Sequence, residues 1–271
     1  MRFNDLLMAA AQGGGLTLDS DVVTWAAQVV TNGGTVSAGR TALVSSFVAA
    51  LKAGSAWTPV DDILLLTAEN ATQQLTSLKQ RRLATAVGAP AFVADVGQAF
   101  NGVDQYINTG FIPSTHAVAL AANDMRLAAY ERTNVGSTTY AAGTFDTTNK
   151  EMRLDPRNAG NRIASTLNST LTAGTTVVSD SRGLTASSRT AAGVWTHWKN
   201  GSSLETIAPA NAAVMPTRAL YIGCYNNAGT AAGFRASTIG LVAVGASMTS
   251  GQELAFYNAV QALMTTLGAN V

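Results

Sequence analysis

Two acidic residues have a spacing that glycoside hydrolysis could use, Glu151 and Asp155. Residues four apart on a β-strand point to the same face of a sheet, and two positioned carboxyl groups are the minimum that this hydrolysis needs. Pro156 ends the strand, and we find no residue in the sequence that would partner either acid. We therefore expect a solvated strand edge here, and no catalytic residues.

The second candidate is a histidine between two tryptophans. His197 lies between Trp195 and Trp198 in the segment 194–199. Strand alternation places Trp195 and His197 on one face of a sheet and Trp198 on the other. One tryptophan is then expected in the core, while Trp198 is a candidate platform for a sugar ring, with His197 beside it. The alternative is that both tryptophans are packed, because buried aromatic side chains dominate protein cores.

The third candidate combines an aromatic ring with two side-chain amides, in Tyr225, Asn226 and Asn227 before the loop 228–233. Sugar sites use this mixture of a ring for stacking and a few placed polar groups. The alternative is an ordinary turn, for which Asn-Asn-Ala-Gly is a typical sequence. With the histidine and the second tryptophan above, these three residues are the candidate glycan-binding residues.

Metal, phosphate and redox chemistry find little support in the sequence. It has one cysteine, Cys224, and two histidines, and no cluster of His, Cys, Asp or Glu has metal-ligand spacing. The glycine run 13–15 lacks the Lys-Ser/Thr that follows in a phosphate-binding loop. We expect no cofactor and no resident metal, and we expect Cys224 to be a buried structural thiol.

Composition narrows the classes of partner. The 271 residues are 47% hydrophobic and 12% charged, with a net charge of +1. This balance excludes a nucleic-acid binder that works through a bulk positive field and a polybasic membrane binder. No segment approaches the roughly 20 apolar residues that cross a bilayer, and the run 6–11 is shorter than the about 7–15 residues of a signal-peptide core. We expect a protein made soluble in a cytoplasm, without nucleic acid or membrane insertion.

The chain divides into an N-terminal arm (residues 1–15), a helical domain (16–89) and a β-rich domain (90–271). Gly13–Gly15 form a hinge behind the arm, because three consecutive glycines cannot hold a helix. A short apolar arm on a hinge is suited to docking on another protein. Its candidate anchoring residues are Arg2, Phe3, Leu6 and Leu7.

Residues 16–89 are expected to form a small bundle of three or four helices. The predicted helices run from Asp19 or Ser20 to Val30, from Ser37 to Gly54, from Thr58 through Leu66, and from Glu69 to Arg82. The first three begin at a residue that can cap a helix, and glycines follow the ends of the first two. Pro59 occupies the first helical position of the third.

From residue 90 the pattern changes to short runs of β-branched and aromatic residues between turn residues. Such runs without intervening helices predict an antiparallel sandwich or barrel. Asn200-Gly201 marks a hairpin, since both turn positions need positive φ. A capping box at 250–253 begins a final helix that Gly268 closes. The predicted strands are 106–107, 125–130, 151–154, 162–166, 175–178, 194–199, 219–224 and 238–244.

Three passages of this part carry a resemblance to a known family. Residues 99–107 read AFNGVDQYI, residues 194–201 read VWTHWKNG, and residues 222–224 and 234–244 precede the final helix. In this order and spacing they resemble the concanavalin A-like lectin/glucanase superfamily in its laminin-G-like form. The resemblance implies a mainly β fold, a jelly-roll sandwich of two antiparallel sheets. The Glu-x-Asp-x-x-Glu triplet of the glucanases is absent, and Asp104 or Asp180 would be the candidates for the calcium that some relatives bind.

The whole arrangement, a helical part before such a sandwich, also resembles proteins of tailed bacteriophages and prophages, most closely over residues 68–86 and 106–113. This implies a non-enzymatic virion component, such as a tail, head or collar appendage, a fibre or a decoration protein. The helical part would attach it to capsid, collar or tail proteins, and the lectin-like sandwich would face outward and could bind a host-surface glycan.

We expect a homo-oligomer, since symmetric particles carry repeated copies, located in the virion after assembly in the bacterial cytoplasm. Two alternatives remain open from the sequence. One is a free carbohydrate-binding lectin module, and the other is a glycan hydrolase or depolymerase.

Overall fold

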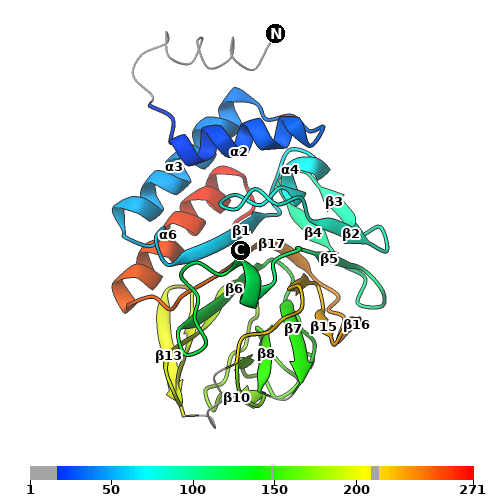
Figure 1. Ribbon diagram of the computed structural model, residues 1–271, viewed down its shortest axis with the longest axis vertical. Helices are drawn as coiled ribbons and strands as arrows, with labels where there is room; N and C mark the ends of the chain where they lie inside the picture. The colour runs from blue at the N-terminus through cyan, green and yellow to red at the C-terminus, as the bar shows by residue number, and fades with distance from the viewer. Residues whose placement is uncertain (1–16, 148, 209–213) are drawn as a thin grey trace.

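Two stacked β-sheets and a layer of helices build the molecule (Figure 1). The computed structural model describes residues 17–147, 149–208 and 214–271. One apolar core lies between the two sheets, and a second lies between the outer face of the eight-stranded sheet and the helices. The structure confirms the expected fold class: a mainly β, jelly-roll-like antiparallel sandwich with N-terminal helices and a C-terminal helix.

The eight-stranded sheet is built around β6 (Met125–Glu131), which pairs on one side with β11 (Gly183–Ala191) and on the other with β17 (Thr238–Gly245). Its alternate residues serve both cores: Leu127 faces the other sheet, and Ala128 faces the helices. The remaining strands are β13 (Ser202–Ile207), β12 (Val194–Lys199), β4 (Gly97–Ala99), β3 (Ala91–Val93) and β1 (Val60–Leu65).

The nine-stranded sheet has seven strands in one path and a hairpin that joins it at β7. In order, the path is β10 (Thr172–Ala173), β9 (Ala164–Leu167), β8 (Lys150–Asp155), β7 (Ala142–Thr147), β14 (Tyr221–Ile222), β5 (Tyr106–Asn108) and β2 (Thr85–Val87). The hairpin consists of β15 (Tyr225–Asn227) and β16 (Thr230–Ala232), and β15 runs parallel to β7.

Helices α2 (Ser20–Thr31), α3 (Ala38–Ala53) and α6 (Ser250–Thr266) form the layer over the eight-stranded sheet (Figure 1). The first two are capped as the sequence predicts. The Asp19 side chain accepts a hydrogen bond from the backbone of Asp21, and the Ser37 side chain accepts one from the backbone of Arg40. None of the helices in the described residues is long and apolar enough to span a bilayer.

The third and fourth predicted helices are wrong. Residues 60–65 form strand β1, which pairs with β17, and within 69–82 the helix is the five-residue α4 (Ala71–Leu75). The run 60–65 is buried throughout, and the short apolar run 63–66 within this segment fits a buried strand as well as a helix. Asp61 serves no helix dipole; its carboxylate accepts the backbone N–H groups of residues 118–120 at 2.7–3.0 Å.

The Asn200-Gly201 hairpin is confirmed: it joins β12 to β13, with φ of +48° and +75° at the two turn residues. The predicted strand over 175–178 is wrong, because these residues form bends and irregular backbone. Strands over 142–147, 183–191 and 202–207 were not predicted, since their Gly, Ser and Thr residues give weak apolar alternation.

The capping box of the C-terminal helix lies one residue before the predicted position. Thr249 caps α6 and Gln252 completes the box. Glu253 instead turns inward and receives two hydrogen bonds from the Arg126 guanidinium, at 2.7 and 2.8 Å. Both side chains are buried, so this pair fixes α6 to β6.

The core under the helices crosses the expected domain boundary at residue 90. It combines Trp25 and Phe47 of the N-terminal helices with Leu241 of β17 and Phe256 of α6. In the structure, residues 17–89 therefore pack as part of the sandwich.

Candidate functional site

The outer face of the nine-stranded sheet lies on the side of the molecule away from the helices (Figure 1). Its residues follow from strand alternation. Met152 and Leu154 of β8 point into the core between the sheets, so Arg153 points outward. Gly143 of β7 pairs with Arg153. Because Gly143 has no side chain, the side chains of Arg153 and Tyr225 can lie over its Cα atom. A Cβ on Gly143 would lie 2.7 Å from Cγ of Arg153 and 2.8 Å from Cβ of Tyr225.

The Arg153 guanidinium is enclosed by three aromatic rings. Its Cζ atom lies 5.0 Å from the ring centre of Tyr140, 5.4 Å from that of Phe145 and 4.8 Å from that of Tyr225. It forms an ion pair with the buried carboxylate of Glu151. Because an arginine over an aromatic face is attracted by the ring quadrupole, Arg153 holds the three rings in place.

A second group of rings continues this face over the neighbouring strands. Tyr106 of β5 stacks on Tyr221 of β14 with ring centres 4.6 Å apart, and Phe234 lies 6.4 Å from Tyr106. Ile107 and Ile222 point into the core, so Tyr106 and Tyr221 point outward. We call these six rings the aromatic face. Tyr106, Phe145, Tyr225 and Phe234 are half-buried and thus accessible to a ligand; Tyr140 and Tyr221 are buried beneath them.

Of the predicted glycan-binding residues, Tyr225 belongs to the aromatic face. Asn226 is buried, where its amide donates to the Ala219 carbonyl at 3.0 Å and accepts from the Gly229 N–H at 2.8 Å. This side chain therefore shapes the β15–β16 turn, as the alternative interpretation expects. Asn227 is half-buried at the edge of the face.

Trp198 and His197 are not part of this face, which corrects the sequence interpretation. Trp198 is 8% exposed, lies in the core beneath the helices, and donates to Ser188 Oγ at 2.8 Å. His197 is fully buried between the two sheets. Neither ring offers a surface to a sugar, because α6 and the second sheet cover the two sides of β12.

Glu205, His197 and Ser165 form a hydrogen-bonded chain whose distances resemble those of a catalytic triad. Its Nδ1 lies 3.1 Å from Glu205 Oε1, and its Nε2 lies 3.0 Å from Ser165 Oγ. Burial lowers the pKa of His197 despite Glu205. Burial raises the pKa of Glu205, yet hydrogen bonds from Thr175 and from His197 hold it at about 2. Ser165 has no exposed surface and also contacts Ser187, so the chain links the two sheets and no substrate can reach it.

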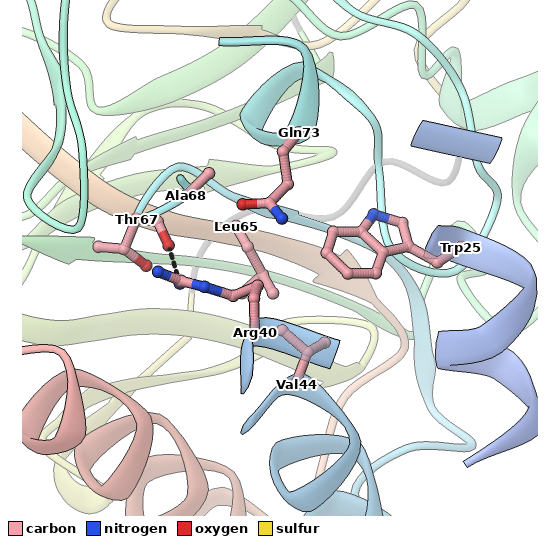
Figure 2. Close-up of a pocket in the computed structure, with 7 residues that line it drawn as sticks. All are labelled: Trp25, Arg40, Val44, Leu65, Thr67, Ala68 and Gln73. Carbon is pink, nitrogen blue, oxygen red and sulfur yellow. Dashed lines mark hydrogen bonds between the residues drawn. The ribbon is translucent and has the colours of Figure 1, made fainter. Parts of the chain in front are cut away.

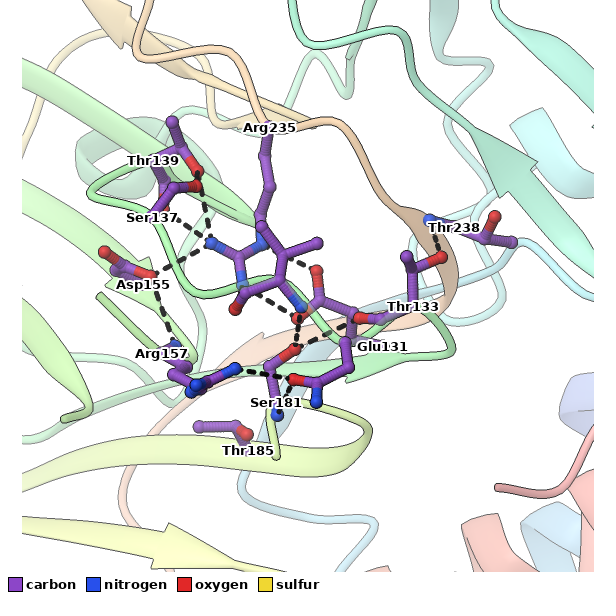
Figure 3. Close-up of polar contacts among 12 residues, drawn as sticks. Glu131, Thr133, Ser137, Thr139, Asp155, Arg157, Ser181, Thr185, Arg235 and Thr238 are labelled. Carbon is purple, nitrogen blue, oxygen red and sulfur yellow. Dashed lines mark hydrogen bonds and ion pairs between the residues drawn. The ribbon is translucent and has the colours of Figure 1, made fainter. Parts of the chain in front are cut away.

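Glu151 and Asp155 are buried and paired, which corrects the expectation of a solvated edge. Arg235 donates to both oxygens of Glu131 at 2.6 and 2.9 Å and to Asp155 Oδ1 at 3.0 Å. Figure 3 shows this group joining the end of β6 to the end of β8. Burial raises the pKa of Asp155 to about 7, against the opposing effect of Arg235. Each of the two carboxylates that were considered for hydrolysis therefore pairs with an arginine, Glu151 with Arg153 and Asp155 with Arg235.

The pocket in Figure 2 is also structural. Arg40 of α3 reaches across it, donates to the Thr67 carbonyl at 2.9 Å and pairs with Asp95, while Trp25 and Gln73 line its walls. The arginine side chain is buried, so it fills the space and joins the helices to the segment after β1.

Within the described residues, no group of three or more His, Cys, Asp or Glu side chains is placed to hold a metal ion. Asp104 is exposed and accepts from Asn101, and Asp180 pairs with Arg182 at 2.6 Å. Cys224 is buried, as expected, and burial raises its pKa to about 12. The candidate anchoring residues Arg2, Phe3, Leu6 and Leu7 lie outside the described residues.

Sequence reasoning missed most of the aromatic face. Apolar and charged residues alternate in the segment 151–154 of the sequence. This alternation could have placed Arg153 on the face of the strand that points away from the core. The pairing that brings Phe145, Tyr225 and Tyr221 to the same surface depends on strand register, which no local pattern gives.

The chain aligns with several solved structures. Domain 4 of AbnA, a GH43 extracellular arabinanase from Geobacillus stearothermophilus in complex with arabinotriose, aligns with a TM-score of 0.52 and 12% identity, over 73% of this chain and 97% of that domain. Trypanosoma rangeli sialidase aligns with a TM-score of 0.47 and 12% identity, over 81% of this chain and 39% of the sialidase. The CBM40 of Ruminococcus gnavus IT-sialidase aligns with a TM-score of 0.39 and 14% identity, over 49% of this chain and 82% of that one.

No family model matches the sequence, and no curated protein matches it. At 12% identity, the likeness to the arabinanase domain shows the fold. The chain is thus an antiparallel β-sandwich with a helical layer on one sheet, which is the fold that the first resemblance in the sequence implies.

Proposed function

We propose that this protein is a non-enzymatic, carbohydrate-binding component of a tailed-bacteriophage virion. The observation that carries the binding part is the aromatic face, four half-buried rings in two neighbouring groups on one sheet surface. Rings held in place beside a few polar groups are what a sugar site needs, because a sugar stacks on the ring and its hydroxyls bond to the polar groups. The arabinanase domain with the same fold was determined with arabinotriose, which supports this part.

The helix layer is suited to attachment. Helices α2, α3 and α6 contain four charged residues, Asp21, Arg40, Lys52 and Glu253. Arg40 and Glu253 are buried, and Lys52 pairs with Asp21 at 2.8 Å. The outer surface of the layer is thus nearly free of unpaired charge, which lowers the cost of covering it with another protein. In the proposed arrangement this layer and the N-terminal arm meet capsid, collar or tail proteins, and the aromatic face points outward.

We propose a non-enzymatic protein because both candidate carboxylates are paired with arginines. Glu151 is paired with Arg153 and Asp155 with Arg235, whereas glycoside hydrolysis needs one free acid and one free base or nucleophile. We expect no release of reducing ends from bacterial capsular or lipopolysaccharide glycans. Turnover that Glu151→Gln abolishes would contradict this and favour a depolymerase.

A glycan array with the purified full-length chain tests the binding part. We expect selective binding that weakens about tenfold or more in Tyr225→Ala and in Tyr106→Ala, because each removes a stacking ring. Tyr257→Ala is the matched control, since Tyr257 lies on α6 in the opposite layer, and it should bind like the unchanged protein. Circular dichroism confirms that each variant is folded. An empty array, or equal binding by all three variants, would reject the aromatic face.

Mass spectrometry of purified particles tests the virion part. We expect the chain at a copy number that matches a symmetric position, as a homo-oligomer assembled in the bacterial cytoplasm. A chain without residues 1–15 should fold but fail to join particles. Normal incorporation of the shortened chain would refute the anchoring role of Arg2, Phe3, Leu6 and Leu7. A soluble chain that binds glycan and never enters particles would favour the free lectin module.

A further inference from the structure

We propose that the aromatic face selects anionic oligosaccharides, whose carboxylates bind Arg218 and Lys150 at its rim. This inference rests on the proposed glycan binding and adds the class of sugar. It comes from the distribution of charge around the rings, since both carboxylates there, Asp146 and Glu151, are buried, whereas the most exposed charge is that of Arg218.

The rim has two cations, the exposed Arg218 and the half-buried Lys150, that share one carboxylate. The side chain of Arg218 is 53% exposed and that of Lys150 is 27% exposed, whereas that of Asp146 is 8% exposed. Lys150 Nζ lies 3.3 Å from Asp146 Oδ2, and Arg218 Nε lies 3.7 Å from Oδ1. One negative charge thus faces two positive charges, and the excess positive charge is on the solvent side.

The Asp146 carboxylate is also held by Thr217, the residue before Arg218. Its Oδ2 atom accepts from the Thr217 N–H at 2.6 Å and from the Thr217 hydroxyl at 2.7 Å. These bonds direct the carboxylate toward the protein. It therefore positions Arg218, the residue after Thr217, and leaves most of the guanidinium free to donate to a ligand.

The other charges of the face balance one another. Arg153 and Glu151 form a pair whose side chains are mostly buried. No carboxylate among the described residues that contact the rings is therefore left unpaired and exposed to repel an anion. The charges of Lys150, Arg153 and Arg218 against those of Asp146 and Glu151 leave one positive charge, which the exposed residues carry.

The cations and the rings are adjacent. Asp146 directly follows Phe145, and Arg218 Nη1 reaches the β15–β16 turn, where it lies 3.8 Å from the position of a Cβ on Gly229. Arg218 also acts on Tyr221: burial raises the pKa of the Tyr221 hydroxyl, and the positive charge of Arg218 opposes that rise. A sugar stacked on Phe145 or Tyr225 would therefore present its substituents to Arg218. Charge-assisted bonds from arginine to a carboxylate are about twice as strong as neutral ones.

The test compares the affinity for an acidic oligosaccharide with the affinity for its neutral methyl ester, which has the same sugar chain. Calorimetry with the unchanged protein measures both. The acidic probes are hexuronate oligomers, beginning with oligogalacturonate, and sialylated oligosaccharides. We expect at least one acid form to bind about tenfold tighter than its ester. Raising the salt concentration should weaken the acid form and leave the ester unchanged.

Variants locate the effect. Arg218→Gln and Lys150→Gln should reduce binding of the acid form to the level of the ester, and their surface positions should leave the fold intact. Arg182→Gln is the matched control, because Arg182 is equally exposed but pairs with Asp180 on another part of the surface. Equal binding of acid and ester, or unchanged binding in Arg218→Gln, overturns this inference and leaves the proposed function standing. Binding of no glycan at all overturns both.

Discussion

At the scale of single residues, the protein handles buried charge by pairing. Arg126 donates to Glu253 through two bonds, and Arg235 does the same to Glu131. A buried pair costs desolvation, but removing one partner leaves an uncompensated charge, which costs about 3–5 kcal/mol. Arg126 therefore joins β6 to α6, and Arg235 joins the segment before β17 to β6.

The Asp155 carboxyl shares its partner, because Arg235 pairs with Glu131 as well as with Asp155. Its Oδ2 atom is buried and has no hydrogen-bond partner among the described residues. Since the folded pKa of about 7 lies above 3.8, the ordinary value of an aspartate, protonation of Asp155 stabilises the fold. That contribution is complete below pH 3.8 and is lost as the pH rises through 7.

The first prediction concerns this group. Asp155→Asn mimics the protonated acid and does not titrate. The unchanged protein loses stability as Asp155 ionises, so the free energy of unfolding of the variant minus that of the unchanged protein should rise by a few kcal/mol between pH 4 and pH 7.5. Urea denaturation at several pH values measures the difference, and taking the difference removes the opposite contribution of His197, whose pKa is lowered. A difference that does not depend on pH would show that Asp155 is ionised throughout.

At the scale of elements, turns and caps decide how the sheets close. Asn200 and Gly201 take the positive φ that a two-residue hairpin needs, and Gly201 also lies under α6. A Cβ on Gly201 would lie 2.9 Å from Cβ of Tyr257. The hairpin therefore supports the C-terminal helix as well as joining β12 to β13.

The second prediction compares two glycines. Gly201→Ala should lower the free energy of unfolding by about 1–3 kcal/mol, because it combines a strained φ with the contact to Tyr257. Gly251→Ala, in the first turn of α6, has nothing within 4 Å of the new Cβ and should leave stability unchanged or slightly raised. Chemical denaturation of both variants checks the ranking, and the reverse order would contradict the contact.

At the scale of the whole molecule, three layers share two cores. The eight-stranded sheet belongs to both, since alternate residues of β6 and β17 face the helices and the other sheet. Strand β1, from the N-terminal part, completes that sheet beside β17. A chain organised in this way should unfold as one cooperative unit.

The third prediction follows. A fragment of residues 90–271 lacks β1, α2 and α3, so it exposes the apolar face that Trp25, Phe47 and Ile63 cover in the whole chain. We expect this fragment to aggregate or to bind a hydrophobic dye, and the full chain to unfold in a single transition. A folded fragment that is as stable as the whole chain would show that residues 90–271 are an independent domain.

Much of the fold could be predicted because the signals were local. The caps of Asp19 and Ser37 depend only on neighbouring residues, and the Asn-Gly pair after the run 194–199 predicts a hairpin. Strand β11 gave no such signal, because GLTASSRTA has few apolar residues. Its serines are buried, and Ser187 contacts Ser165 of the other sheet, a contact that exists only after the sheets have stacked.

The sequence by itself determined the class of fold, the helix caps, the main turn and the near-neutral charge, since each of these depends on neighbouring residues or on composition. The tertiary structure decided which aromatic residues can meet a ligand. It buried Trp198 and His197, and it brought Tyr106, Phe145 and Tyr225 to one surface. The physical reason is that a strand gives each residue only a choice of two faces, while the register between distant strands and the layer packed on each face determine which side chains stay in contact with water.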